Sequence, residues 1–204
     1  SDSSTQVTIA IGTNPSSGTL SGTLTKTVAS GLATFNNLSI NLTGSGYTLS
    51  AEASSLTSAT SSPFNITPAS SSKLRFVSQP PSNTQAGSAM STFTVEVLDA
   101  SNNRVTSDNS TQITMKIFNN AGSGTLTGTT TRTAASGIAT FNDLKIDKAG
   151  LGYTLRALAT GITSADSSSF NISPAAANKL GFIVQPANSV SGQNISPAPV
   201  VAIQ

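Results

Sequence analysis

The sequence predicts an all-β protein, and three observations lead to this fold class. Apolar and polar residues alternate along short segments such as Gln6–Ile11, which is typical of half-buried strands. Glycine-rich turn signals separate these segments, and no segment shows the apolar period of an amphipathic helix. A cassette, residues 29–49, recurs as residues 135–155, with Tyr47 and Tyr153 at matching positions 106 residues apart. A repeat of this length is one whole domain, so we expect tandem β-sandwiches.

The expected strands of the first copy follow in order along the chain. The first, Gln6–Ile11, places Val7 and Ile9 on its inward face, and Gln112–Ile117 keeps the same inward positions. Further strands are expected at residues 32–40, 47–53 and 63–67. The aromatic residues that recur at the same spacing are predicted to form the core: Phe35, Phe141, Tyr47, Tyr153, Phe64 and Phe170.

The repeat is permuted with respect to the chain. Residues 73–174 hold one complete domain, from the Lys-Leu-x-Phe motif at Lys73 to the last strand. Residues 1–68 hold only the later strands of a second domain, and residues 179–204 hold only first strands. The sequence therefore predicts one complete domain flanked by two complementary partial domains.

The terminal segment aligns with the start of the complete domain. The Lys-Leu-x-Phe motif recurs at Lys179, and a one-residue deletion then matches Gly87 with Gly192 and Val95 with Val200. The first residue is Ser1 rather than Met, which is expected of a processed or excised piece.

Composition excludes several classes of protein. Charged residues make up 9% of the chain, against about 25% in an average domain, so solubility must come from Ser, Thr and Asn. This composition favours an extracellular or cell-surface location. A net charge of +2 with scattered Lys and Arg argues against nucleic acid as a partner. No apolar run reaches the roughly 20 residues of a membrane-spanning helix.

Neither catalysis nor a cofactor is predicted. The chain has no Cys and no His, which removes thiolate metal sites and the commonest general base. The eight acidic residues are dispersed, and Glu52 has no acidic counterpart one repeat later. Serine without histidine lacks its usual activating base. We therefore expect a protein that is not an enzyme.

One loop is a candidate calcium site. Its oxygen-bearing side chains are those of Asp99, Asn102, Asn103 and Asp108, and such hard ligands suit Ca²⁺. Their spacing does not match an EF-hand, and Asp2 repeats Asp108, so a role in turns is the alternative.

Two other patterns each have a special and a plain interpretation. Lys73 and Lys179 begin first strands while Asn65 and Asn171 lie in last strands, as a Lys–Asn isopeptide crosslink would require. Surface Lys and turn Asn residues are the plain interpretation. The threonine-rich stretches 23–27 and 129–133 would form either an ice-binding hydroxyl row or the solvated face of a strand.

Several motifs together resemble a known family. They are Val95-Glu96-Val97-Leu98-Asp99 leading into Asn103-Arg104-Val105, the repeated Ser-Gly-x-Ala-Thr-Phe and Gly-Tyr-Thr-Leu, and the closing Phe-Asn-Ile. The chain resembles the bacterial immunoglobulin-like repeats of invasin- and intimin-type adhesins and giant surface proteins. The resemblance implies immunoglobulin-like sandwiches that act as spacers. Tyr47 and Tyr153 resemble the tyrosine corner of such domains, whose hydroxyl bonds nearby backbone; the alternative is a core aromatic residue at the start of a strand.

The leading functional hypothesis is a structural subunit of an extracellular filament or surface fibre. Copies would join head to tail by sharing strands, because the two partial domains would lie roughly 40 Å apart within one chain. The interface is expected at Leu180, Phe182, Val184 and Val200 on one side, and at Val7, Ile9, Phe35 and Phe64 on the other. The alternatives are a segment of an adhesin stalk that spaces a tip domain from the cell, and a carbohydrate- or receptor-binding module.

Overall fold

The computed structural model describes residues 2–203, which form strands and loops without a helix. The all-β prediction is confirmed, and this part of the chain contains no helix long and apolar enough to cross a membrane. The outermost residues of the two predicted partial domains, Ser1 and Gln204, lie outside the described range. The strands pair within three groups, residues 6–66, 73–173 and 180–203. We call these groups the first unit, the second unit and the terminal hairpin.

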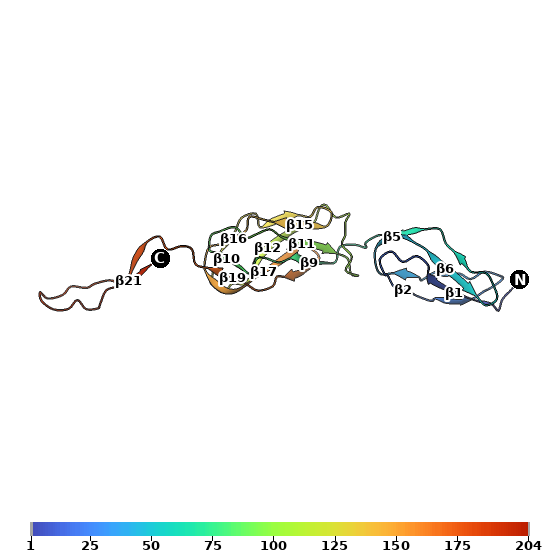
Figure 1. Ribbon diagram of the computed structural model, residues 1–204, viewed down its shortest axis with the longest axis horizontal. Coiled ribbons are helices and arrows are strands. Elements are labelled where there is room, and N and C mark those ends of the chain that lie inside the picture. The colour runs from blue at the N-terminus through green and yellow to red at the C-terminus, as the bar shows by residue number, and fades with distance from the viewer. Residues whose placement is uncertain (1, 204) are drawn as a thin grey trace.

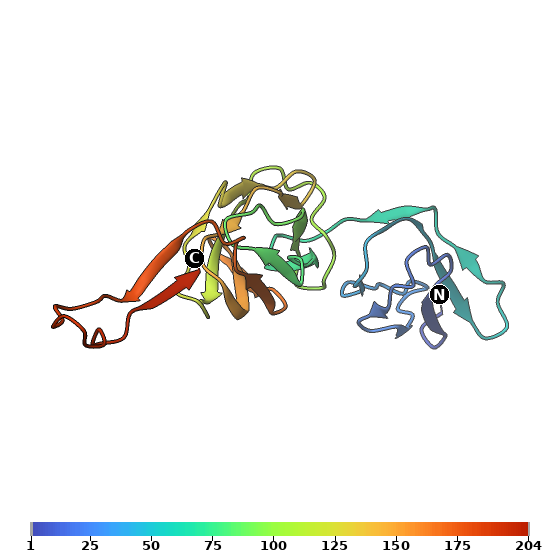
Figure 2. The ribbon, with the colours of Figure 1, turned by 60° about the vertical axis from the view of Figure 1, so that its left-hand side comes forward.

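The three parts follow one another along the long axis of the molecule. The first unit lies at the N-terminal end, the second unit is in the middle, and the terminal hairpin extends from the opposite end (Figure 1). A view turned by 60° shows the same separation between the hairpin and the first unit (Figure 2). The hairpin therefore does not pack on the first unit of its own chain.

The second unit contains most of the paired strands. One sheet runs in the order β10-β19-β17-β18-β9-β11-β15, with β12 pairing β17 and β14, and a separate pair is formed by β13 and β16. The bounds are β9 (Lys73–Ser78), β10 (Asn83–Gln85), β11 (Phe93–Leu98), β12 (Gln112–Asn119), β13 (Leu126–Thr127), β14 (Thr131–Thr133), β15 (Ile138–Phe141), β16 (Lys145–Ile146), β17 (Gly150–Ala159), β18 (Ile162–Asp166) and β19 (Phe170–Ser173).

The second unit has a closed apolar core. On β12 the side chains of Ile113 and Met115 are buried while Thr114 between them points outward. The ring of Phe93 stacks against those of Phe76 and Phe141, with centroids 6.0 Å and 5.5 Å apart. Each fully buried side chain of this size stabilises the fold by about 1.5–3 kcal/mol. The sheets enclosing one core are consistent with a β-sandwich.

The first unit repeats part of this arrangement. Its strands are β1 (Gln6–Ile11), β2 (Leu20–Ser21), β3 (Thr25–Thr27), β4 (Ser39–Ile40), β5 (Gly44–Tyr47), β6 (Leu49–Ala53), β7 (Ala59–Thr60) and β8 (Phe64–Ile66). They form a sheet in the order β3-β1-β6-β7 and two separate pairs, β2-β4 and β5-β8. β1 and β3 pair in the same register as β12 and β14: Gln6 lies opposite Thr27, and Gln112 lies opposite Thr133 one repeat of 106 residues later.

Strands that depend on β9 or β11 in the second unit are shortened or lost in the first. In the second unit β15 pairs with β11, and β18 lies parallel to β9. The counterpart of β15 would be residues 32–35, which are not a strand, and the counterpart of β18 is the two-residue β7. The strand predicted at residues 32–40 is therefore wrong except at Ser39–Ile40, because its neighbour is not present among residues 2–66.

The predicted aromatic core is confirmed in the second unit and only partly in the first. Phe141, Tyr153, Phe170 and Tyr47 are buried. Phe35 and Phe64, the other two predicted members, are half-buried. The division of the chain into one complete and two partial domains stays a prediction.

The bond predicted between each tyrosine hydroxyl and nearby backbone is confirmed. Tyr47 Oη donates to the carbonyl of Leu42 at 2.9 Å, and Tyr153 Oη donates to that of Lys148 at 3.0 Å. A Cβ at Gly124 would lie 2.8 Å from the hydroxyl of Tyr153. Only glycine therefore fits the backbone against this hydroxyl.

Candidate assembly site

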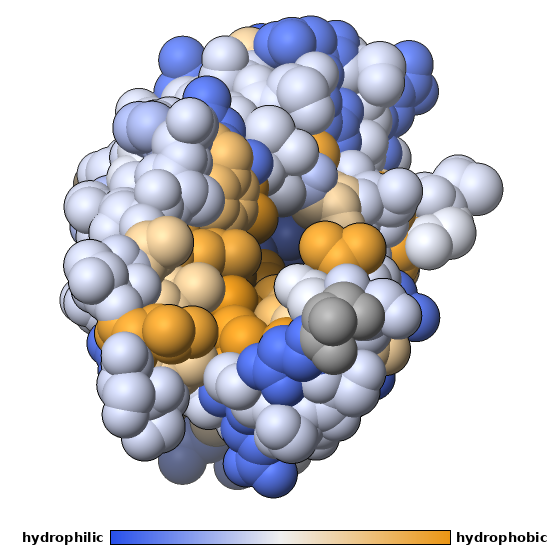
Figure 3. Space-filling model, turned by 90° about the vertical axis from the view of Figure 1, so that its right-hand side faces the viewer, coloured by the Kyte–Doolittle hydropathy of each residue, from blue (hydrophilic) through white to orange (hydrophobic). Residues whose placement is uncertain are grey.

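The first unit contains an open apolar groove. It includes a pocket of about 140 Å³ lined by Leu20, Leu38, Ser39, Ile40, Leu49, Phe64 and Ile66. Seen from the N-terminal end of the molecule, hydrophobic residues gather in a hollow that opens toward the viewer (Figure 3). The counterparts of Leu38, Ile40 and Ile66 in the second unit are at most 2% exposed. The groove thus exposes residues whose sequence equivalents are core.

In the second unit a specific segment covers these positions. The Gly87 N–H donates to the carbonyl of Ile146 and the Met90 N–H donates to that of Leu144, both at 2.8 Å. Met90 is 2% exposed, and β10 pairs alongside β19. In the described part of the first unit no strand lies over the equivalent Ile40 and Leu38. The groove is therefore the space that β9 to β11 fill in the second unit.

The groove is bordered by backbone without a ladder partner. Residues 33–35 correspond to Ala139–Phe141, which pair with β11 in the second unit. Between residues 2 and 203, no strand pairs with 33–35, and the adjacent Leu32 side chain is 73% exposed. An unpaired strand edge beside an apolar face is a template for another strand.

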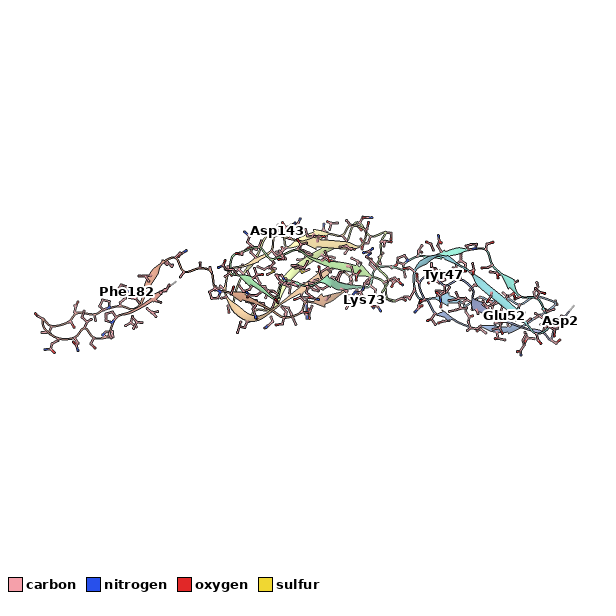
Figure 4. The ribbon with its side chains drawn as sticks, viewed as in Figure 1. Asp2, Tyr47, Glu52, Lys73, Asp143 and Phe182 are labelled. Carbon is pink, nitrogen blue, oxygen red and sulfur yellow. The ribbon has the colours of Figure 1, made fainter. Side chains whose placement is uncertain are left out.

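The terminal hairpin is the complementary exposed element. It consists of β20 (Leu180–Val184) and β21 (Val200–Ile203). Leu180 lies opposite Ile203, and Phe182 lies opposite Val201, so these four side chains share one face. All four are exposed, Leu180 and Ile203 by more than 70%. Phe182 and Asp2 lie near opposite ends of the molecule (Figure 4).

The register of the hairpin equals that of β9 with β11. The pair Leu74 and Val97 recurs as Leu180 and Ile203, and the pair Phe76 and Val95 recurs as Phe182 and Val201. Both ladders also shift register at the same position. Val201 and Ile203 therefore stand where Val95 and Val97 are fully buried.

This register corrects the sequence alignment. Val184 and Val200 correspond to Ser78 and Thr94, whose hydroxyls lie 3.1 Å apart on the surface of the second unit. Val200 is thus not the counterpart of Val95, and the predicted deletion does not extend into β21. Gly87 and Gly192 both have positive φ and lie in corresponding turns. Up to this turn the terminal segment is one residue shorter than the second unit, and between the turn and β21 it has one residue more.

The turn itself keeps the predicted match. The Gln193 N–H donates to the carbonyl of Val190 as the Ser88 N–H donates to that of Gln85. Ile195 follows Gly192 by three residues, as Met90 follows Gly87, and it is 49% exposed.

The predicted interface residues lie in two separate places. Val7, Ile9, Phe35 and Phe64 are half-buried residues of the first unit. Leu180, Phe182, Val184 and Val200 belong to the hairpin at the other end of the chain. Sequence reasoning missed further apolar residues of the same surfaces, although their repeat spacing from buried residues is a usable signal: Leu38, Ile40, Leu49, Ile66, Ile195, Val201 and Ile203.

The candidate calcium loop forms a joint between the two units. Asp99 accepts hydrogen bonds from the N–H and the Nδ2–H of Asn103 and from the Ala69 N–H, at 2.8–3.1 Å. Burial raises the pKa of Asp99, but these bonds outweigh it and hold the pKa below its usual range. Asp108 accepts from Ser71 of the linker and from Thr111. Its pKa is lowered in the same way.

Asn103 connects the joint to the first unit directly. Its Oδ1 accepts from the Thr43 N–H at 3.1 Å, and its Nδ2 donates to the Asn41 carbonyl at 2.9 Å. Asn102 takes a left-handed conformation with φ of 71°. Across residues 2–203, no three His, Cys, Asp or Glu side chains gather as a metal site would require. N–H and O–H donors of the protein thus bond the carboxylates of Asp99 and Asp108, the two acidic residues among the candidate calcium ligands.

The other two sequence patterns have plain structural roles. Lys73 Nζ donates to the Ala100 carbonyl at 3.1 Å, while Asn171 Oδ1 accepts from the Gly152 N–H at 3.0 Å. Each of these side chains thus bonds a backbone group of another residue. In the threonine stretches, Thr25 and Thr131 each pair their hydroxyl with a threonine of the neighbouring strand at 2.9 Å.

Comparisons with known proteins add little. No family model and no curated protein matches the chain. Two solved structures of beta-glucuronidase from Parabacteroides merdae, one with glycerol in its active site, align at 15% identity with TM-scores of 0.36 and 0.37. Each alignment covers 79% of this chain and 20% of the enzyme, so the chain spans about a fifth of that length. A likeness at this level carries no conclusion about function.

Proposed function

We propose that the chain is a structural subunit of an extracellular filament or surface fibre built from tandem immunoglobulin-like sandwiches. Copies join head to tail when the terminal hairpin of one copy completes the first unit of the next. The observation that carries this proposal is the shared register of β20–β21 and β9–β11. The hairpin has the pairing of the strands that have no counterpart in the described first unit.

The positions of the groove and the terminal hairpin favour an open polymer over a closed ring. The groove opens at the N-terminal end of the molecule and the hairpin extends from the other end. A contact between two different surfaces at opposite ends is heterologous, and it propagates unless a rotation closes it into a ring. The elongated arrangement of the units therefore favours a filament.

The exposed apolar area supports the strength of such a contact. Leu180, Phe182, Val201 and Ile203 are all exposed on the hairpin. Full burial of four such side chains contributes about 6–12 kcal/mol before the costs of association and ordering. Main-chain hydrogen bonds along the edge at residues 33–35 would add to this, as in other cases of strand addition.

The joint between the units favours a second structural function. Asn103 holds the second unit against the first by two hydrogen bonds, and Asp99 accepts a third from Ala69 of the linker. Such a joint suits a segment of an adhesin stalk that keeps a tip domain away from the cell. A carbohydrate-binding module is less favoured, because both tyrosines are fully buried and cannot stack on a sugar.

Light scattering on two versions of the chain tests the proposal. The 204-residue chain should form linear polymers whose mass grows with concentration, visible as filaments by electron microscopy. The same chain without residues 179–204 should remain a monomer with an intact second unit. A full chain that stays monomeric would favour the stalk segment, and polymers that persist without residues 179–204 would contradict strand sharing.

A further inference from the structure

We infer that the hairpin of a second copy docks with Val201 and Ile203 facing inward and converts residues 33–35 of the first unit into a strand. The occupant of the groove is residues 180–203 of another copy of this chain. The inference rests on the proposed function and adds the register, the buried face and a local structural change that reports docking.

The register follows from the second unit. There β11 pairs with β15, so that Val95 lies opposite Ala139 and Glu96 lies opposite Ile138. The hairpin reproduces the β9–β11 ladder at the repeat spacing. The same spacing places Val201 opposite Ala33 and Ala202 opposite Leu32 of the next copy. Residues 33–35, which have no paired strand in the described first unit, then pair with β21 of the other copy as β15 pairs with β11.

The side chains fit the groove in this register. Leu180 and Phe182 take the places of Leu74 and Phe76, which are buried in the second unit. Pro199 precedes Val200 and so takes the place of Phe93, whose ring contacts both Phe76 and Phe141 there. A smaller side chain at this position leaves room for the ring of Phe35 to turn inward against Phe182.

Pro199 also sets the end of the new ladder. Phe93 lies opposite Phe141 in the second unit, so Pro199 would lie opposite Phe35 of the next copy. Proline has no N–H, and it is tolerated at the first residue of a strand. The carbonyl of Pro199 can still accept from the Phe35 N–H. The shared ladder therefore ends at Phe35.

Ile195 is assigned to the open pocket. Met90 is covered in the second unit and its N–H donates to the carbonyl of Leu144. Ile195 lies three residues after Gly192 in the sequence, as Met90 lies three residues after Gly87. Its N–H would therefore bond the carbonyl of Leu38, and its side chain would enter the pocket lined by Leu38 and Ile40.

The opposite face of the hairpin stays in solvent. Val200 corresponds to Thr94, whose hydroxyl bonds that of Ser78 at the surface. Val200 and Val201 are adjacent, similarly exposed at 43% and 48%, and identical in side chain. They form a matched pair in which only Val201 is predicted to be buried by docking.

The first arm of the test uses this pair in the full chain. Val201→Asp should weaken polymerisation roughly 100-fold or more, because a carboxylate would be buried without a partner. Val200→Asp should leave the concentration dependence of light scattering unchanged. Both residues are exposed in the free chain, so neither substitution removes a core contact there.

The second arm follows the segment that becomes a strand. The chain contains no Trp, so Phe35→Trp introduces a single tryptophan at a half-buried site, which can be excited selectively over the two tyrosines. Its emission should shift to the blue as the concentration rises, and Val201→Asp in the same chain should abolish the shift. Phe118→Trp, at a 55% exposed site of the second unit, is the control and should not respond.

The outcomes separate this inference from the proposed function. Polymers that tolerate Val201→Asp but not Val200→Asp would overturn the register while leaving the filament in place. Polymers that form without a shift at Phe35→Trp would overturn the formation of the new strand. A full chain without polymers at any concentration would overturn the proposed function itself.

Discussion

The first and second units have closely related residues at their core positions, yet the second unit buries more of them. Phe141 is fully buried and Phe35, one repeat earlier, is only half-buried; Ile113 and Val7 differ in the same way. The difference lies in β9 to β11, which pair with β15 and β18 and cover the core of the second unit. Burial at these two positions is therefore decided by a neighbouring strand and not by the residue's own segment.

Other features are identical in the two units, because they are made within the shared part. Both tyrosine hydroxyls bond a carbonyl five residues earlier. Asn14 and Asn120 each bond both the N–H and the carbonyl of a glycine four residues later. These local arrangements do not require β9 to β11. The comparison thus separates what the repeated segment can form alone from what it needs a partner to form.

The largest expected effect comes from alanine substitutions at the paired phenylalanines. Phe141→Ala should lower the free energy of unfolding of the second unit by about 3–5 kcal/mol, because it removes a fully buried ring. Phe35→Ala should cost less than half of this in dilute protein, since Phe35 is partly solvated. Urea unfolding of each variant at low concentration measures both values. Equal costs at the two sites would remove the basis of the comparison.

A smaller and equal effect is expected at the two tyrosines. Tyr47→Phe and Tyr153→Phe each remove one hydrogen bond to a backbone carbonyl. Each should destabilise its own unit by about 1 kcal/mol, the net contribution of a typical hydrogen bond. Thermal unfolding followed by calorimetry would compare them. A much larger loss at Tyr153 would show that this hydrogen bond depends on the strands that cover the second unit.

The smallest effect concerns pH and the repeated aspartates. The pKa of Asp2 is lowered by the Thr5 hydroxyl and by the N–H groups of Ser4 and Thr5. Burial raises the pKa of Asp108, but bonds from Thr111, Ser110 and Ser71 lower it below the ordinary 3.8. A folded pKa below the unfolded one means that the ionised carboxylate stabilises the fold above the unfolded pKa, and that this stability is lost as the pH falls through the folded pKa.

Melting temperatures below about pH 4 should therefore decline. Asp108→Asn should reduce this decline more than Asp2→Asn, because Asp108 is mostly buried and also holds Ser71 of the linker. Melting curves of the two variants between neutral and acidic pH make the measurement. If Asp2→Asn reduced the decline in melting temperature more than Asp108→Asn, the contact of Asp108 with the linker would add no stability.

Sequence reasoning succeeded where a pattern is local. The alternation along Gln112–Ile117 and the glycine turn before Tyr153 are properties of short segments, and the structure has the strand and the hydroxyl bond they predict. The repeat spacing also identified Phe141 and Phe170 as core. These features depend on few contacts outside the segment.

Sequence reasoning failed where a distant segment decides. Residues 33–35 have the pattern of a strand but no neighbour to pair with in the described part of the chain. The alignment placed Val200 at an inward position because it continued the one-residue deletion past Gly192, whereas the ladder with β20 assigns that position to Val201. The sequence also showed no sign of two N–H donors at the loop of Asp99 and Asn103, because these donors belong to residues far away in the sequence, Thr43 and Ala69.

The joint at Asn103 has a consequence for the shape of any long assembly. One planar amide both accepts from Thr43 and donates to Asn41, so it resists twisting as well as bending between the two units. An angular error at a joint is multiplied by the length of everything beyond it. Replacing this amide by a group that makes only one of the two bonds would leave each unit folded, but it would let the direction of the chain drift from unit to unit.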